Sequence, residues 1–187
     1  MLSMTSVWPK SKQYYNLLIK LKATLPNAAK KLKDKFNIEY EDLSEVHLLP
    51  IKVCIETSLR DFQFKVLNYI TCTNILLKKL GVVDSDICSF CNLSREEIEH
   101  MLFNCSVSKN FWNDFKWYWY CNTKEIIMLS LKDIIVGVFG KGNDFLNYCI
   151  LVGKSVIYYC NTELYIAQKN NILHIFHKKW KFKPLTH

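Results

Sequence analysis

The sequence predicts an all-α, mostly helical protein. Half of its 187 residues are apolar and 22% are charged, which provides enough material for a core and argues against global disorder. Only five glycines and four prolines are present, which argues against a loop-dominated or all-β sandwich design. Apolar residues recur at helical spacing in most segments. The length suits one domain of ordinary size, or one domain with an appended arm.

The N-terminal part is expected to hold three helices. Residues 8–22 place leucines at helical spacing, and Pro26 ends this pattern. Asn27 is the expected cap of a second, very basic helix. A short third helix is expected over DLSEVHLL, which ends before Pro50. The β-branched residues of IKVCIE, which follow, are compatible with an extended segment.

Capping residues mark the helices in the middle of the chain. Ser58, with Asp61 three residues later, predicts a capping box at the start of TSLRDFQFKVLNYI. In the next segment, TNILLKKLG, Thr73 is the expected N-cap and Gly81 the expected C′ glycine. These signals predict two helices separated by a short turn.

The C-terminal half continues the helical pattern. In SVSKNFWNDFKWYWY, the aromatic residues Phe111, Phe115 and Trp119 share one helical face, so packing in the core is the favoured interpretation. The remaining helical segments are LKDIIVGVF and residues 143–180, where the pattern predicts one broken helix or two.

Charge is spread unevenly along the chain. The net charge is +8, with +7 in residues 1–35, −5 in residues 36–105 and +6 in residues 106–187. Basic ends around an acidic middle indicate a polyanionic partner, above all RNA or DNA. A protein whose helices are simply covered with lysines is the alternative.

No targeting segment is evident. The start, MLSMTSVWPKSK, lacks the apolar stretch of a secretory signal. Lys154 interrupts the best candidate for a membrane span, YCILVGKSVIYYC, so no membrane association is expected. We therefore expect an intracellular protein, nuclear or cytoplasmic, in which eight cysteines are thiols or metal ligands rather than disulfides.

Three cysteines and a histidine form one compact cluster, with the spacing Cys88-x2-Cys91-x8-His100-x4-Cys105. A C-x2-C pair suits a tight turn in which both sulfurs face one point. Ser94, with a glutamate three residues later at Glu97, predicts a capping box that starts a short helix carrying His100.

The position of the last cysteine restricts where that helix ends. Cys105 lies five residues after His100, about 140° around an ideal helix. The helix is therefore expected to end near Phe103 or Asn104, so that Cys105 can fold back beside His100. The result would be a Cys3His tetrahedral site of the structural kind.

The donor set predicts the metal. Three thiolates and one imidazole favour zinc over magnesium or calcium, and a closed set of four ligands indicates one structural Zn²⁺ and no catalytic position. Buried apolar thiols and a thioredoxin-like redox pair are the alternatives, although the latter needs a βαβ context that is missing. Ordinary buried thiols are the interpretation of the other cysteines: Cys54, Cys72, Cys121, Cys149 and Cys160.

The order of these motifs resembles the zinc-binding region at the C-terminus of LINE-type (non-LTR) retrotransposon reverse transcriptases. The motifs that carry the resemblance are FQFKVL, the Thr73–Asn74 pair, the DICSFC knuckle, EHMLFNC and Phe111–Trp112. The resemblance covers roughly residues 55–182 and implies a helical reverse-transcriptase-type zinc-binding domain, assigned to residues 51–187, after a basic helical N-terminal arm at 1–50.

The resemblance also implies contact with template RNA or target DNA near a polymerase. The lysines and aromatic residues at the ends of the chain are the residue types that such contact needs. Lysines can neutralise phosphates, and the aromatic residues Phe176, Trp180 and Phe182 between the C-terminal lysines can stack on bases. The predicted nucleic-acid-binding lysines are Lys10, Lys12, Lys20, Lys22, Lys30, Lys31, Lys33 and Lys35 in the N-terminal arm, and Lys178, Lys179, Lys181 and Lys183 in the tail.

The chain departs from the family in lacking the polymerase: it contains no Asp-Asp pair and is too short for fingers and palm. We expect a binding module that is not an enzyme, corresponding to a C-terminal fragment of a retrotransposon reading frame. The alternatives are a zinc-stabilised scaffold for protein contacts, for example with the polymerase portion, a thiol enzyme using Cys88 and Cys91, and a decayed copy without function.

Overall fold

The computed structural model describes residues 28–162 of the chain. This part is mostly helical and contains no β-strand, which confirms the predicted fold class. The helices are α2 (Ala28–Phe36), α3 (Tyr40–Val53), α4 (Thr57–Leu67), α5 (Asn74–Lys79), the π-helix η1 (His100–Asn104), α6 (Ser106–Thr123), α7 (Leu131–Val136) and α8 (Asp144–Thr162).

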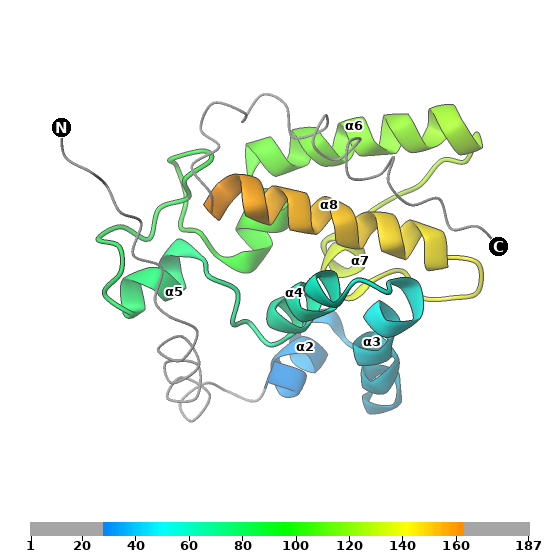
Figure 1. The fold of residues 1–187 in the computed structure, drawn as a ribbon, viewed down its shortest axis with the longest axis horizontal. Coiled ribbons are helices and arrows are strands. Elements are labelled where there is room, and N and C mark those ends of the chain that lie inside the picture. The colour runs from blue at the N-terminus through cyan, green and yellow to red at the C-terminus, as the bar shows by residue number, and fades with distance from the viewer. Residues whose placement is uncertain (1–27, 163–187) are drawn as a thin grey trace.

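The helices form layers around α8. Helices α6 and α8 run side by side in opposite directions, and α2, α3 and α4 lie on the other side of α8 (Figure 1). Gly153 permits the close approach of α6, because a Cβ atom there would lie 3.0 Å from the Trp112 ring and 3.1 Å from Phe111. No helix in residues 28–162 is long and apolar enough to cross a membrane.

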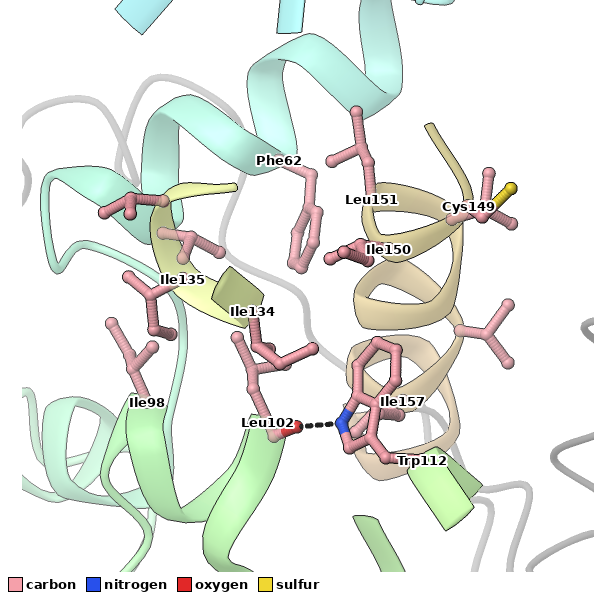
Figure 2. Packing of buried hydrophobic residues seen from close by; sticks show 14 of the residues in the cluster. Phe62, Ile98, Leu102, Trp112, Ile134, Ile135, Cys149, Ile150, Leu151 and Ile157 are labelled. Atoms are coloured by element: carbon pink, nitrogen blue, oxygen red, sulfur yellow. Dashed lines mark hydrogen bonds between the residues drawn. The ribbon is translucent and has the colours of Figure 1, made fainter. Parts of the chain in front are cut away.

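One continuous apolar core joins the elements, and Figure 2 shows its centre. Phe62 of α4, Ile134 and Ile135 of α7, and Ile150 of α8 are all buried there. The Trp112 indole N–H donates to the Leu102 carbonyl over 2.7 Å, so a polar contact fastens α6 to η1 inside the core.

Helix α3 differs from the expected short helix. It does not end before Pro50 but continues to Val53, and the extended backbone expected over IKVCIE is found only after the helix, at Cys54, with φ −141° and ψ 133°, and at Glu56, with φ −68° and ψ 112°. Pro50 removes one backbone donor, but Val46 and Val53 on either side of it are buried against the core, and this packing outweighs the local preference. The boundary expected between the N-terminal arm (1–50) and the zinc-binding domain (51–187) therefore falls inside α3.

The same core includes residues assigned to the N-terminal arm. Leu32 of α2 and Val46 of α3 are fully buried, and Ile38 between the two helices is 1% exposed. Residues 28–53 thus pack with the rest of the described chain, whereas the first expected helix, at 8–22, and the expected cap Asn27 lie outside the described residues.

Of the two predicted N-caps of α4 and α5, one is wrong and the other is confirmed. Helix α4 begins at Thr57 after Glu56, without a side-chain cap, so the capping box predicted at Ser58 is wrong. Thr73 caps α5 as predicted, and its side chain accepts from the Leu76 N–H. Gly81 has φ +69° and lies in a left-handed C′ position, where glycine carries no steric penalty.

A buried lysine connects three helices. The Lys154 amine on α8 donates to the Gln63 side-chain oxygen of α4 and, at 3.4 Å, to the Ile135 carbonyl at the end of α7. The Gln63 amide donates to the same carbonyl over 2.9 Å. Burial, which no carboxylate of residues 28–162 offsets by an ion pair, lowers the pKa of Lys154 to about 7.

Replacement of Lys154 by Met should change how stability depends on pH. Between about pH 7 and 10 the unfolded chain binds a proton at this lysine that the folded chain does not, so the free energy of unfolding of the wild type rises with pH. Lys154→Met removes this contribution, which has a limiting slope of about 1.4 kcal/mol per pH unit. Urea unfolding of both proteins from pH 6 to pH 9 measures the difference.

The stability of Lys154→Met relative to the wild type is expected to be most favourable near pH 6 and to decline towards pH 9. Loss of the hydrogen bond to Gln63 shifts all values equally and does not affect this trend. A difference between the two free energies that stays constant across this range would show that the buried amine is not neutral at the upper end.

Candidate metal centre

The four residues of the cysteine cluster converge on one point. The ligand atoms of Cys88, Cys91, His100 and Cys105 all lie within 4.8 Å of one another. The Cys88 and Cys105 sulfurs are 3.9 Å apart, and Cys91 Sγ lies 3.3 Å from His100 Nε2. Cys88 and Cys105 are buried, whereas Cys91 and His100 are half-buried. The site therefore lies at the edge of the core.

These distances fit the edges of a tetrahedral zinc site. Zn–S bonds of about 2.3 Å and Zn–N bonds of about 2.0–2.1 Å imply edges of about 3.8 Å between two sulfurs and about 3.6 Å between sulfur and nitrogen. The observed 3.9 and 3.3 Å are close to both. Three sulfurs and one imidazole nitrogen are also the donors that zinc prefers over hard cations. The donor set and its geometry thus fit a structural zinc ion.

The first two ligands lie in a small hairpin. Residues Ile87 and Arg95 form an isolated antiparallel bridge, and the Cys88 N–H donates to the Ser94 carbonyl over 2.8 Å. At the tip, the Asn92 N–H donates to the Cys88 carbonyl over 2.9 Å, and Asn92 itself has φ +55°. This turn places Cys91 beside Cys88, with both sulfurs on one side.

The hairpin corrects the predicted start of the ligand helix. Ser94 lies in the returning arm, where its carbonyl is paired with Cys88, and does not cap a helix. The capping box expected from Ser94 and Glu97 is therefore wrong, because bridge pairing of the arm keeps this segment out of the helical conformation. The first helical hydrogen bond of the next element instead runs from the Met101 N–H to the Glu97 carbonyl.

The last two ligands are aligned by a π-helix. The helix ends at Asn104, as expected, and the Cys105 N–H donates to the His100 carbonyl over 2.7 Å. This i→i+5 bond closes a wider turn than that of an α-helix, so two residues five apart come to the same side. The π-helix thereby accommodates the four residues between His100 and Cys105, and α6 begins directly after Cys105.

The two facing thiols titrate as a pair. The hydrogen bond from Cys88, together with the N–H groups of Val107 and Ser108 at the start of α6, lowers the pKa of Cys105 to about 5 despite burial. The same sulfur contact, and then burial, raise the pKa of Cys88. The N–H groups of Phe90 and Cys91 act in the opposite direction on Cys88. Backbone donors of both elements thus point at sulfurs that must be thiolates to bind metal.

Glu96 holds the hairpin against α5. Its side chain is nearly fully buried, at 1% exposed, and its two oxygens accept from the Asn74 N–H at 2.9 Å and the Ser89 N–H at 3.0 Å. Within residues 28–162 no cation faces this carboxylate in an ion pair. The first turn of α5 and the tip of the hairpin therefore share one buried acceptor.

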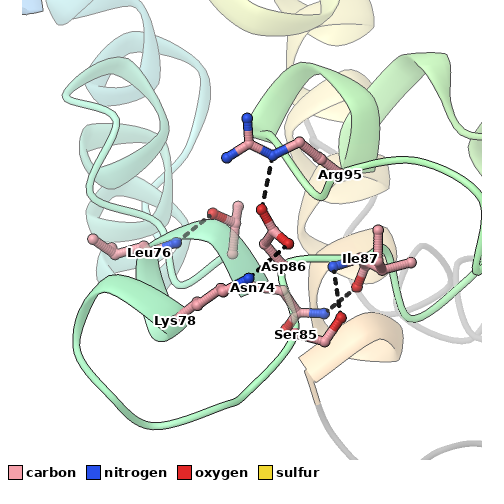
Figure 3. Close-up of polar contacts among 8 residues, drawn as sticks. Asn74, Leu76, Lys78, Ser85, Asp86, Ile87 and Arg95 are labelled. Carbon is pink, nitrogen blue, oxygen red and sulfur yellow. Dashed lines mark hydrogen bonds and ion pairs between the residues drawn. The ribbon is translucent and has the colours of Figure 1, made fainter.

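Asn74 completes this connection. Its side-chain amide donates to the Ile87 carbonyl at 2.7 Å (Figure 3). The same amide donates to the Ser89 hydroxyl at 3.0 Å. The Thr73–Asn74 pair thus has two functions, because Thr73 caps α5 and Asn74 binds the arm that carries Cys88. Sequence reasoning did not identify Glu96 or the role of Asn74.

Asp86 fixes the base of the hairpin from the solvent side. One carboxylate oxygen lies 2.8 Å from Arg95 Nε on the opposite arm, and the other lies 3.2 Å from the Lys78 amine of α5 (Figure 3). These two contacts, with Arg95 first, lower the pKa of Asp86. As exposed ion pairs they contribute little individually, but they orient both arms relative to α5.

A buried acidic residue links the ligand helix to α2. Glu99, next to the ligand His100, is 5% exposed and lies 2.7 Å from the Lys35 amine of α2. Burial is the largest effect and opposes ionisation of Glu99, but the hydrogen bond and charge of Lys35, a backbone N–H and the Tyr69 hydroxyl together outweigh it, so the net effect is a lowered pKa. Tyr69 lies beside this pair, with its pKa raised by burial and by Glu99. The Lys31 amine lies 3.6 Å from the centre of the Tyr69 ring.

These contacts bear on the lysines predicted to bind nucleic acid. Lys31 and Lys35 are engaged within the fold, and burial is the main cause of the lowered pKa of Lys31. Lys30 is exposed and Lys33 is half-buried. The other predicted lysines lie outside the described residues: Lys10, Lys12, Lys20, Lys22, Lys178, Lys179, Lys181 and Lys183.

The remaining cysteines lie away from the cluster. Cys54, Cys72, Cys149 and Cys160 are buried thiols, as predicted. Cys121, at the end of α6, is exposed, so the prediction is wrong for this residue. Its place on the outward face of the helix, two positions after the buried Trp119, accounts for the difference.

The fold and the site together define a helical zinc-binding module whose metal position joins a hairpin to a π-helix. The protein family described as zinc-binding in reverse transcriptase matches residues 49–112. The match begins in α3, includes all four ligands and ends at Trp112 in α6. This region is therefore similar to the zinc-binding domain of reverse transcriptases. No curated protein and no solved structure matches the chain.

Substitution of Glu96 by Gln should weaken zinc binding about tenfold or more, the usual effect of losing a residue that orients a metal ligand. The side chain keeps its size, but its NH2 group would face an N–H donor of Asn74 or Ser89 instead of accepting from it. Competition with a chromophoric chelator measures the affinity.

Glu97→Gln is the matched control, because Glu97 is the exposed neighbour of Glu96 and its substitution removes the same charge. Equal zinc affinities for Glu96→Gln and Glu97→Gln would show that the buried carboxylate does not support the site.

Proposed function

We propose that the protein is a nucleic-acid-binding accessory module of the non-LTR retrotransposon (LINE) type, held folded by one structural zinc ion. The observation that carries this proposal is that the ligand atoms of Cys88, Cys91, His100 and Cys105 lie within 4.8 Å of one another inside the region that matches the reverse transcriptase family. The ligand identities, their distances and the family match all favour zinc.

The distribution of charge supports a polyanionic partner. Residues 28–162 contain sixteen Lys and Arg and sixteen Asp and Glu, so this part carries no net charge. The net charge of +8 therefore comes entirely from residues 1–27 and 163–187. Clustered lysines on a chain with a neutral body favour electrostatic, sequence-independent contact with phosphates, and RNA or DNA is the natural partner.

The site favours binding over catalysis. When bound, zinc would supply folding free energy by joining the hairpin to the π-helix, whose residues Met101 and Leu102 are already packed in the core. Four protein ligands leave no position for a substrate, and Glu99 beside His100 is already paired with Lys35. The absence of an Asp-Asp pair from the sequence supports a module without a polymerase site, which acts beside a polymerase portion inside the cell.

Purified protein is expected to contain one zinc per chain by native mass spectrometry. Cys88→Ser should lose the metal together with helical signal in circular dichroism, because three ligands rarely hold a structural zinc ion. Cys121→Ser, which changes an exposed cysteine outside the cluster, should retain both. A folded wild type without zinc would overturn this part of the proposal.

Binding to RNA or DNA should weaken steeply with salt. Between about 50 and 200 mM salt, each lysine that contacts a phosphate contributes about 0.7–0.9 to the slope of log K against log salt. Lys178→Ala with Lys179→Ala should reduce this slope by about 1 to 2. Lys52→Ala with Lys141→Ala removes the same charge from exposed sites of the described body and should change the slope less. Salt-independent binding would contradict the proposal.

A protein-binding scaffold is the second candidate. It is favoured by the segment between α6 and α7, in which Ile126 and Met128 are 82% and 86% exposed. Between them, Ile127 packs against the core, so the outward apolar residues alternate with inward ones. Zinc-dependent capture of a polymerase portion, without any affinity for RNA or DNA, would favour this function over the first.

A further inference from the structure

The outward face of α6 is unlike the rest of the described surface. Its inner face packs in the core through Phe111, Phe115 and Trp119, which are at most 6% exposed. On its outer face, Trp117 is 68% exposed and Tyr120 is 40% exposed. Large aromatic side chains are costly to leave in water, and an exposed Trp beside an exposed Tyr is typical of a binding surface.

The two exposed rings form a pair. Trp117 and Tyr120 are three residues apart and so lie on the same side of the helix. Their ring centres are 6.0 Å apart, with an angle of 37° between the ring planes. Helix α6 forms the outer layer of the described structure, and α8 lies only on its inner side (Figure 1). The pair therefore presents two neighbouring, mutually tilted aromatic rings outwards.

Basic and amide side chains surround this pair. Lys109, Asn113, Trp117 and Tyr120 occupy one stripe at helical spacing, Lys124 follows as the left-handed C-cap residue of α6, and all five are exposed. The Lys124 amine lies 6.0 Å from the centre of the Tyr120 ring. Lys116 borders the stripe and is half-buried. Asp114, which is exposed and three residues before Trp117, lies beside the stripe, but the three lysines Lys109, Lys116 and Lys124 outnumber it, so this face is positive although the described body is neutral.

We propose that this stripe, defined as Lys109, Asn113, Trp117, Tyr120 and Lys124, binds single-stranded nucleic acid, with unpaired bases stacked on Trp117 and Tyr120 and lysines on the phosphates. The proposal rests on the nucleic-acid-binding function proposed above and adds the class of substrate. Bases in a duplex are already stacked, so only single strands can offer their faces to these rings.

The composition of the stripe favours nucleic acid over protein. A protein-docking patch is expected to be depleted of lysine, whereas stacking platforms for single strands combine aromatic rings with positive charge along the path of the backbone. Charge complementarity with a polyanion is therefore present in the stripe itself, independently of the basic flanking segments.

The test uses the full zinc-loaded chain and a fluorescein-labelled RNA about 16 nucleotides long, without self-pairing, beside its duplex. Trp117→Ala should weaken binding to the single strand about tenfold, a typical loss for one stacked base, with the salt slope unchanged because no charge is removed. Trp117→Phe keeps an aromatic ring and should restore most of the affinity. Binding to the duplex should change by less than about twofold.

Ile55→Ala is the matched control, because Ile55 is an exposed apolar residue, at 83%, remote from α6. Zinc content and circular dichroism of Trp117→Ala should equal those of the wild type, since the side chain is exposed. Lys124→Ala should lower both the affinity and the salt slope, by about 0.7 for one phosphate contact on a single strand.

The failure of this inference is distinguishable from failure of the proposed function. If the wild type binds RNA with a steep salt dependence and Trp117→Ala binds equally well, the stripe is not the base-binding surface and the proposed function stands. If Trp117→Ala instead changes only self-association in sedimentation, the stripe is a protein contact and the inference is overturned. If the wild type binds neither strand form at low salt, both fall.

Discussion

The path of the chain from α5 to α6 depends on one constraint. Two metal-ligand pairs, one in a hairpin and one in a π-helix, must lie next to each other. The hairpin brings Cys88 and Cys91 together, and the π-helix brings His100 and Cys105 together. Neither element is long enough to be stable alone, so their mutual position has to come from outside them. A metal ion held by the four residues would supply that restraint from one side, and the Glu96 carboxylate supplies it from the other by joining the hairpin to α5.

Much of this arrangement could be predicted from the sequence because it depends on local spacing. Ligand spacing, the cap at Thr73 and the C′ glycine at Gly81 each need only a few neighbouring residues. The predictions are wrong where contacts between residues far apart in the sequence determine the local structure. Ser94 has the neighbours of a helix cap, but pairing with Cys88 places it in a hairpin. Pro50 has the chemistry of a helix end, yet packing on both sides carries α3 past it.

Glu96 shows why supporting residues are harder to recognise than ligands. Three glutamates lie within four positions, and nothing local distinguishes them, but Glu96 is buried against α5, Glu97 is exposed and Glu99 faces α2. Their roles follow from the direction in which each points once the hairpin has returned to the π-helix. The same holds for the lysines of α2, where Lys35 is committed to Glu99 while Lys30 is exposed.

The ion pair between Lys35 and Glu99 also determines how small a fragment can be and still fold. The reverse transcriptase family match begins at residue 49, after α2 and most of α3. A fragment cut there would leave the buried Glu99 carboxylate, one residue from a metal ligand, without its cation, and would uncover the core that Leu32 and Val46 close. The packed core of residues 28–162 therefore includes α2, which begins about twenty residues before the family match.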